Sequence, residues 1–293
     1  GLLVHGSEAE VEASVLSRCA SRGINVQGDV ATGRGSLLLS ASILSSNDGL
    51  GVFIGGSDVI IENSIVQDTH RIGDFGRGIH VQRDPTTSER ATVKVRGSVI
   101  ERSVDVGIAV VDSDLDLESS IVRDTASSSA GTVGDAVAAV ASANVNASGV
   151  RLESSARAGA TCFGATLSLA TSALICNPIQ LDKEATGPIA GTLLDLGGNS
   201  CGCGGTMGSC QALTSGLEPP AALPNCGAHT PVDDPCGALH AGKSAGRSRV
   251  NNCIFVQWSP APAFAASIWT RSSCPWSGSS TRRSRASRWW SAG

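Results

Sequence analysis

The sequence contains no tyrosine and few other large aromatic residues. Aromatic residues make up 3% of the 293 residues, and all five tryptophans lie at or beyond Trp258. Residues 1–240 hold three phenylalanines, Phe53, Phe75 and Phe163. Large aromatic side chains dominate most globular cores and most sugar-binding sites. Their scarcity predicts that something other than aromatic packing holds the core together.

Long apolar runs are also missing. No stretch of 18 apolar residues occurs, so we expect no membrane span, and no secretory leader is recognisable. All 26 acidic residues lie in residues 1–240, while eight of the 22 Lys and Arg residues follow residue 240. An acidic body disfavours nucleic acid and anionic membrane surfaces as partners.

A short phrase, serine followed by two apolar residues, recurs along the chain. Its copies begin at Ser14, Ser42, Ser64, Ser98 and Ser120, with weaker copies at Ser148 and Ser172. An apolar residue lies three positions before each serine: Val11, Leu39, Ile61, Val95, Leu117, Val145 and Leu169. A small or polar residue stands between the two. The spacing indicates a repeat with a base period of about 22 residues and a short strand in each copy.

A second phrase, glycine, apolar, any residue, apolar, follows the first four serine phrases. Copies begin at Gly23, Gly51, Gly78 and Gly107, and residues 1–4 match it too, so we expect the chain to begin partway through a repeat. No stretch shows a 3.6-residue apolar stripe. A repeat of this length is too short for a propeller blade, and its Val and Ile residues are unlike a leucine-rich repeat. A parallel β-helix, in which one repeat makes one coil, remains.

We therefore predict an all-β solenoid of about seven coils in residues 7–182. The predicted inward columns are the apolar set above, the adjacent small residues, and a second apolar set at Val15, Ile43, Ile65, Val99 and Ile121. The predicted units are the β-helix in residues 1–182, a Cys-rich capping region in residues 183–240 and an irregular tail in residues 241–293.

The segment from Gly56 to Val66 resembles a coil of the right-handed parallel β-helix, or pectin-lyase-like, superfamily. The resemblance covers about residues 1–182 and implies the fold. It leaves function open, because the superfamily includes lyases, hydrolases, tailspikes, adhesins and proteins without known activity. Its hydrolases usually show paired aspartates on a coil strand and a Gly-His-Gly segment. Here the only adjacent aspartate pair, Asp233-Asp234, lies outside the coils, and His80 is followed by Val81 rather than glycine.

Three groups of residues are candidates for function. Asn25, Phe53 and His80 take the outward position of the second phrase, where a groove between insertions at residues 70–77 and 126–134 would contact a sugar; an ordinary mixed surface is the alternative. Asp112, Asp114 and Asp116 occupy alternate positions, so they would share one face of a continuous strand. They are interpreted as weak calcium ligands or, alternatively, as an acidic solvated turn. Asp68, Arg102 and Asp124 are predicted to align as a solvated charge ladder.

The cysteines gather after the last coil phrase, at Cys162, Cys176, Cys201, Cys203, Cys210, Cys226 and Cys236. Disulfides in an oxidising compartment are the main interpretation, with free thiols or a structural zinc site as alternatives, although Cys-Gly-Cys lacks the usual zinc spacing. We predict at least one disulfide within residues 162–236.

The tail beyond residue 240 is rich in Arg, Ser and Trp and has no acidic residue. Three interpretations of this composition are open: a basic binding tail, a disordered tail or an out-of-frame translation. We expect the tail to add no strand to the coils. Residues 237–244 match a phosphate-binding loop, but no strand and helix flank them, so nucleotide binding is not predicted.

The sequence thus favours a non-catalytic extracellular or cell-envelope β-helix with a structural, adhesive or carbohydrate-contacting surface. It is expected to be a monomer or part of a longer chain, to need no cofactor except calcium at the acidic turn, and to meet polysaccharide or another cell-surface component. The alternatives are a polysaccharide lyase or glycoside hydrolase and a receptor-binding module. A cluster of acidic, His and Arg residues with shifted pKa values would favour an enzyme.

Overall fold

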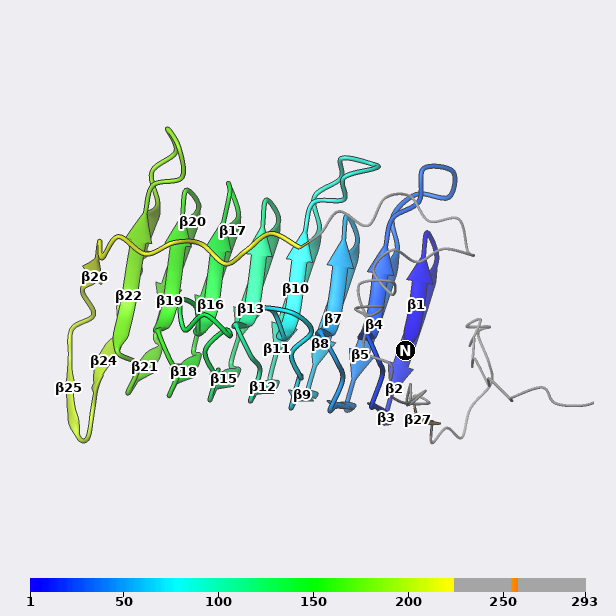
Figure 1. Ribbon diagram of the computed structural model, residues 1–293, viewed down its shortest axis with the longest axis horizontal. Helices are drawn as coiled ribbons and strands as arrows, with labels where there is room; N and C mark the ends of the chain where they lie inside the picture. The colour runs from blue at the N-terminus through cyan, green and yellow to red at the C-terminus, as the bar shows by residue number, and fades with distance from the viewer. Residues whose placement is uncertain (224–253, 258–293) are drawn as a thin grey trace, which may run out of the picture.

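The computed structural model describes residues 1–223 and the backbone of residues 254–257. These residues form a rod of stacked coils in which each coil contributes one strand to each of three sheets (Figure 1). Eight coils, from Leu2 to Cys203, lie within the described residues. The parallel β-helix is confirmed, and its coils continue beyond residue 182.

Sheet A has nine strands: β1 (Leu2–His5), β4 (Arg22–Gln27), β7 (Leu50–Gly55), β10 (Arg77–Gln82), β13 (Val106–Val111), β16 (Asp135–Val140), β19 (Ala158–Phe163), β22 (Ile179–Glu184) and β26 (Ala212–Leu213). Sheet B has eight: β2 (Glu8–Glu12), β5 (Ser36–Ser40), β8 (Asp58–Glu62), β11 (Thr92–Arg96), β14 (Asp114–Glu118), β17 (Asn144–Ser148), β20 (Thr166–Ala170) and β23 (Thr192–Asp195).

Sheet C has ten: β3 (Ser14–Ser17), β6 (Ile43–Ser45), β9 (Ile65–Gln67), β12 (Val99–Glu101), β15 (Ile121–Arg123), β18 (Arg151–Glu153), β21 (Ala173–Ile175), β24 (Ser200–Cys203), β25 (Thr206–Gly208) and β27 (Ile254–Gln257). Neighbours are parallel except β25 with β24 and β27 with β3. The expectation that the tail adds no strand is therefore wrong for residues 254–257; the rest of it lies outside the described residues.

The recurring serines form a hydrogen-bonded ladder at the corner between sheets B and C. The Ser42 hydroxyl accepts the Ser14 backbone N–H at 3.0 Å and donates to the Ser40 carbonyl at 2.7 Å. Ser64, Ser98 and Ser120 repeat the contact with the preceding coil. The serine phrase therefore stabilises the stacking as well as marking the period, because these buried backbone groups need partners.

The interior confirms the first apolar column and corrects the second. Ile43, Ile65 and Val99 do stack in register, but they lie on the outer face of sheet C. The inward column is one residue later: Leu16, Leu44, Val66, Ile100 and Val122, all at most 2% exposed. The buried serine ahead of each pair accounts for the error, because inward and outward side chains alternate along a strand.

The small residues predicted to face inward instead turn the corner between sheets B and C. Ala13, Ala41, Asn63, Ser119 and Thr171 adopt φ between 46° and 49° and are exposed. A single left-handed residue turns the chain sharply, which favours small or Asn side chains.

The weak copy at Ser148 is displaced by two residues. Ala147 pairs with Leu117 in place of Val145, and Val150 rather than Ser148 takes the serine position, donating its N–H to Ser172.

Candidate functional site

The predicted row of Asn25, Phe53 and His80 lies in register across β4, β7 and β10. The Phe53 and His80 rings stack with centroids 5.9 Å apart, and the Arg22 guanidinium lies 4.3 Å above the Phe53 ring. Phe53 and His80 are not exposed as expected, since they are 4% and 0% exposed, whereas Asn25 is half-buried. The prediction was right about alignment and wrong about access.

His80 is the first member of a buried polar cluster on this face. Its Nδ1 accepts a hydrogen bond from Arg77 Nη1 at 3.1 Å, and its Nε2 faces Gln82 Oε1 at 3.0 Å, which together assign the proton to Nε2. Burial, followed by the Arg77 charge, holds the pKa of His80 well below its usual value. His80 is therefore a neutral acceptor that orients Arg77.

Arg77 also binds a buried acid. Its Nε donates to Asp105 Oδ2 at 2.8 Å, and the two side chains are 1% and 4% exposed. Burial raises the pKa of Asp105 despite the neighbouring guanidinium. Removing water penalises the carboxylate more than this arginine stabilises it.

A second pair repeats the arrangement on β16. Arg157 binds Asp135 through two hydrogen bonds, of 2.8 and 2.5 Å, and Thr161 Oγ1 donates to the same carboxylate at 2.9 Å. Asp135 is fully buried, and its burial raises its pKa. Bidentate geometry fixes the guanidinium plane.

The third acid of the face is Asp182 on β22. Burial and the nearby Glu184 carboxylate raise its pKa, and its Oδ1 has no hydrogen-bond partner. Its Oδ2 accepts the Ser215 N–H at 3.0 Å.

Residues 214–223, which we call the strap, run across sheet A and cover these groups. Figure 1 shows the strap leaving β26 and crossing β22, β19, β16 and β13 to reach β10. Arg157 Nη1 donates to the Glu218 carbonyl at 2.9 Å, and Arg77 Nη2 donates to the Ala221 carbonyl at 2.5 Å. The insertions at residues 70–77 and 126–134 do meet at one corner, where Ser129 donates to Asp74. The predicted open groove is thus occupied by the chain itself.

Sequence reasoning missed Arg77, Asp105, Asp135, Arg157 and Asp182. One signal was present: Arg77 and Asp135 stand where Leu50 and Val106 begin the neighbouring strands. Arg22 on β4 also pairs with Leu50, so charged and apolar residues alternate at this position from coil to coil. Packing alone does not require such an alternation. The strap itself carries no repeat phrase, so its path was not readable.

The alternating aspartates are engaged by arginines. Asp112 accepts from Arg83 at 2.6 Å and from Arg90 at 2.5 Å, and Asp114 accepts from Arg90 at 2.7 Å. Asp116 accepts from Asn146 at 3.0 Å. Within the described residues, no group of three or more His, Cys, Asp or Glu is placed to hold a metal ion. Calcium binding by Asp112, Asp114 and Asp116 stays a prediction, and a bound ion would have to displace these arginines.

The charge ladder forms in part. Arg102 Nε donates to Asp68 Oδ1 at 2.6 Å, as aligned coils require. Asp124 lies 3.9 Å from Arg123 instead of completing the ladder.

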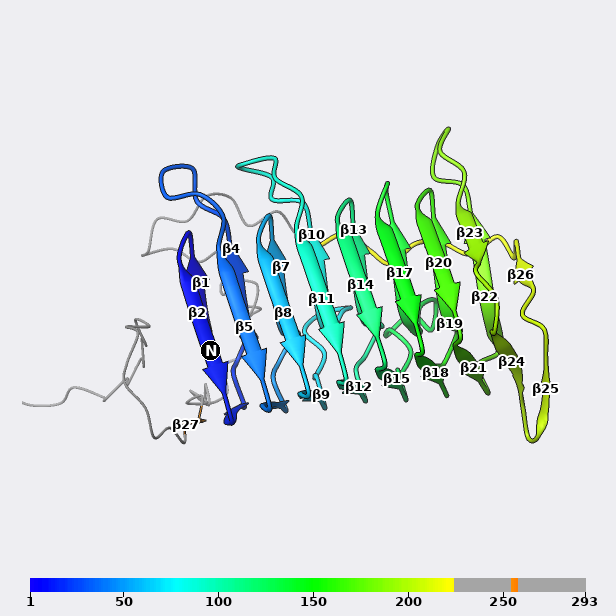
Figure 2. The same cartoon turned by 180° about the vertical axis from the view of Figure 1, so that it is seen from behind.

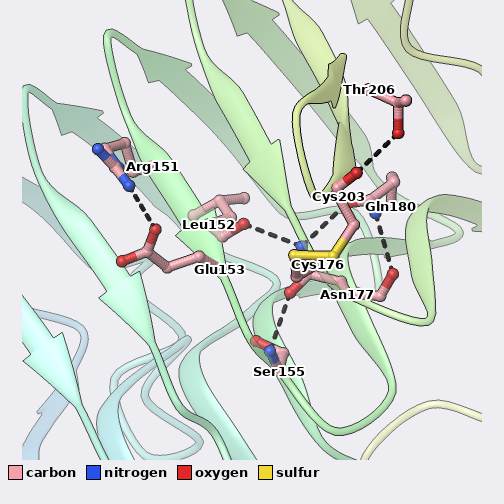
Figure 3. The surroundings of a disulfide bond; sticks show 9 residues. All are labelled: Arg151, Leu152, Glu153, Ser155, Cys176, Asn177, Gln180, Cys203 and Thr206. Atoms are coloured by element: carbon pink, nitrogen blue, oxygen red, sulfur yellow. Dashed lines mark hydrogen bonds and ion pairs between the residues drawn. A yellow bond between two sulfur atoms is a disulfide. The ribbon is translucent and has the colours of Figure 1, made fainter. Parts of the chain in front are cut away.

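Two disulfides close the C-terminal end of the coils, as predicted for residues 162–236. Cys176 joins Cys203 and Cys201 joins Cys210. In Figure 3 the first bond lies beside Asn177, whose side chain contacts Ser155 and Leu152 of the preceding coil. Cys162 is a buried free thiol, so its candidacy for a disulfide is wrong. Cys226 and Cys236 lie outside the described residues.

Comparison with protein families identifies a match. A family model described as "Right handed beta helix region" matches residues 1–170. The search of curated proteins finds no relative that matches the chain. Among the described residues no helix is long and apolar enough to cross a membrane.

Proposed function

Because the chain belongs to the right-handed β-helix family, we propose that it is a non-catalytic extracellular or cell-envelope scaffold that contacts polysaccharide or another cell-surface component. One observation carries the proposal. The face on which a row of acidic groups lies is closed by the strap, and each acid of the row already has a partner there.

The non-catalytic part rests on proton availability. A general acid or base must reach the proton that it transfers. Asp105 faces Arg77, Asp135 faces Arg157 and Thr161, and Asp182 faces the strap backbone. In this arrangement the row stabilises the closure of the strap.

Contact with carbohydrate is assigned to the outer face of sheet B (Figure 2). Asn144 and Asn146 are exposed on β17, in register with Thr92 and Lys94 two coils away. Asp114 and Asp116 lie between them and accept a hydrogen bond from Asn144 and Asn146 respectively. Amide and hydroxyl groups both donate and accept hydrogen bonds, as sugar hydroxyls require. Their repetition at the ~4.8 Å strand spacing offers a regular polar surface without aromatic residues.

The extracellular location is supported by the two disulfides. Such bonds persist in oxidising compartments and are rare where thiol reductants are present.

A binding and cleavage screen tests the proposal. The full chain is incubated with acidic and neutral polysaccharides, and co-sedimentation is measured together with release of unsaturated or reducing ends. We expect co-sedimentation without cleavage, and weaker binding when Asn144 and Asn146 are both changed to Ala. Changing Gln67 to Ala on sheet C is the matched control. Cleavage of any substrate, or binding that the Asn144/Asn146 variant leaves unchanged, would overturn it.

The runner-up is a polysaccharide lyase or hydrolase, favoured by one observation. Asp105, Asp135 and Asp182 share a face with Arg77 and Arg157, and burial raises the pKa of each of the three acids. Acids with raised pKa values are typical of proton donors at neutral pH. Cleavage that disappears in Asp135→Asn would establish this function in place of the scaffold.

A further inference from the structure

Burial along the strap repeats at every third residue, which an irregular segment would not show. Leu217 and Leu223 are half-buried and Pro220 is buried, while the residues between them are exposed. A proline fixes its own φ and restrains the preceding residue to extended conformations, so Glu218 and Pro219 are held extended and the φ of Pro220 is fixed. Polyproline II has three residues per turn, so every third side chain points to the same side. The burial pattern of the strap has this period.

Contacts with the strap use its backbone. At one end the Ser215 N–H binds Asp182, and the Gly216 and Leu217 N–H groups bind Glu184 Oε1 at 2.6 and 3.3 Å. At the other end arginines bind the carbonyls of Glu218 and Ala221, which are again three residues apart. Acidic side chains thus accept hydrogen bonds from the strap N–H groups at one end, and arginines donate to the strap carbonyls at the other. This arrangement favours one N-to-C direction of the strap across sheet A.

The arginines are held in place by other groups of the coils. Arg77, 1% exposed, is fixed by Asp105 and His80, and Arg157 is fixed by Asp135 and the Thr132 carbonyl at 2.7 Å. Stacking of the coils does not by itself require Arg77, because Leu50 occupies its position one coil earlier, although Arg22 occupies it two coils earlier. Burying these ion pairs costs desolvation free energy, and their guanidinium groups donate to backbone carbonyls of the strap.

We propose that the outer face of sheet A from β10 to β22 is a binding groove for an extended, proline-containing peptide, and that the strap occupies it as an intramolecular ligand. Three polyproline II residues advance about 9 Å, which matches two coils at the ~4.8 Å strand spacing. The period of the peptide therefore fits the period of the solenoid. The ligand class needs an apolar or proline side chain at every third position, and the scaffold function does not depend on it.

Tethering explains why the groove is filled. A covalently attached segment acts at an effective concentration on the order of millimolar. A peptide of the same class from another molecule binds when the strap is weakened.

The test uses the full chain and a labelled synthetic peptide with the sequence of residues 214–223. The variant Pro220→Asp places a charge at the buried strap position, and Pro219→Asp makes the same change at an exposed neighbour. Fluorescence anisotropy measures peptide binding, and thermal melts by circular dichroism confirm that each variant is folded. We expect the peptide to bind Pro220→Asp at least about tenfold more tightly than the wild type or Pro219→Asp, which keep the groove filled.

Peptide variants supply the specificity control without altering the protein. A peptide carrying Pro220→Asp should bind at least tenfold more weakly to the Pro220→Asp chain than the peptide carrying Pro219→Asp. Equal binding of the two peptides, or no binding by the folded Pro220→Asp chain, would overturn the proposal.

Hydrogen exchange on the wild type gives an independent measurement if Pro220→Asp does not fold. The amides of Ser215, Gly216 and Leu217 should be protected relative to the free peptide, and added peptide in excess should not change the protection of the coils. Exchange of these three amides at the free-peptide rate would show that the strap is not bound, and the proposal would fail.

Discussion

Ion pairs between coils occur on two kinds of surface in this molecule, and they behave differently. On the covered face of sheet A, Asp105 and Asp135 pair with arginines, yet their pKa values are raised. On the open faces of sheets B and C, Asp58, Asp68 and Asp114 make the same kind of pair, and hydrogen bonds from arginine lower their pKa values. The side chains are alike, so the difference is solvent access. By covering the ion pairs of sheet A, the strap adds a desolvation cost that the exposed inter-coil pairs do not have.

The largest expected effect comes from breaking one pair on each surface. Arg77→Met should destabilise the fold by about 3 to 5 kcal/mol, because it leaves Asp105 buried without its partner. Arg102→Met, on the open surface, should cost about 0 to 1 kcal/mol. Denaturant unfolding of both variants measures the two free energies. Equal losses would mean that the cover has no energetic consequence.

The inner and outer faces of sheet C provide the second contrast. Ile100→Ala removes a fully buried side chain and should cost about 2 to 5 kcal/mol. Ile65→Ala, on the half-buried outer column, should cost clearly less, since solvent fills the space that it leaves. Thermal and denaturant midpoints of the two variants measure the two losses of stability. A larger loss for Ile65→Ala would show that Ile65, and not Ile100, faces the interior.

The pH dependence of the two surfaces should have opposite signs. A raised carboxyl pKa contributes stability that is present below the ordinary pKa and is lost as pH rises through the folded value. Asp182→Asn keeps an acceptor for Ser215 and removes the charge beside Glu184. We expect it to raise stability at neutral pH and to flatten the loss on going from acid to neutral pH.

Asp68→Asn is the matched change on the open surface. The lowered pKa of Asp68 contributes stability above its ordinary value that is lost as pH falls. The variant should therefore be less stable than the wild type at neutral pH and converge with it in acid. Melting curves between acid and neutral pH report both cases, and parallel profiles would contradict the assignment.

The smallest expected effect lies at the corner between sheets C and A. Asn47 Oδ1 accepts the Cys19 N–H at 3.0 Å and its Nδ2 donates to the Leu16 carbonyl, whereas the buried Thr125 hydroxyl has no partner. Thr125→Asn should add equivalent bonds and stabilise by about 0.5 to 1.5 kcal/mol.

A matched control for this change is Ser155→Asn. Asn47 packs against Gly23, where a Cβ would lie 2.8 Å from its Nδ2, and Gly107 stands in the same place beside Thr125. Ala136 replaces that glycine next to Ser155, so Ser155→Asn should give no gain. Stabilisation by both changes would show that the glycine is not required.

The amino-acid sequence alone determined the solenoid. The serine phrase recurs because each hydroxyl bonds the coil before it, and stacked coils force like residues into register. Local repetition is therefore enough to predict the coils, the first apolar column and the alignment of Asn25, Phe53 and His80. It is not enough to assign the inward side of a strand of three residues, where one buried serine shifts the alternation.

The tertiary structure alone decided what happens on sheet A. The strap is far in sequence from the residues that it covers, with 144 positions between Arg77 and Ala221. No period links them, and only folding brings the backbone of one to the guanidinium of the other. Whether His80 lies on a surface or in an interior, and whether an aspartate beneath the strap has a raised or a lowered pKa, depends on that contact, because solvent access is a property of the folded chain.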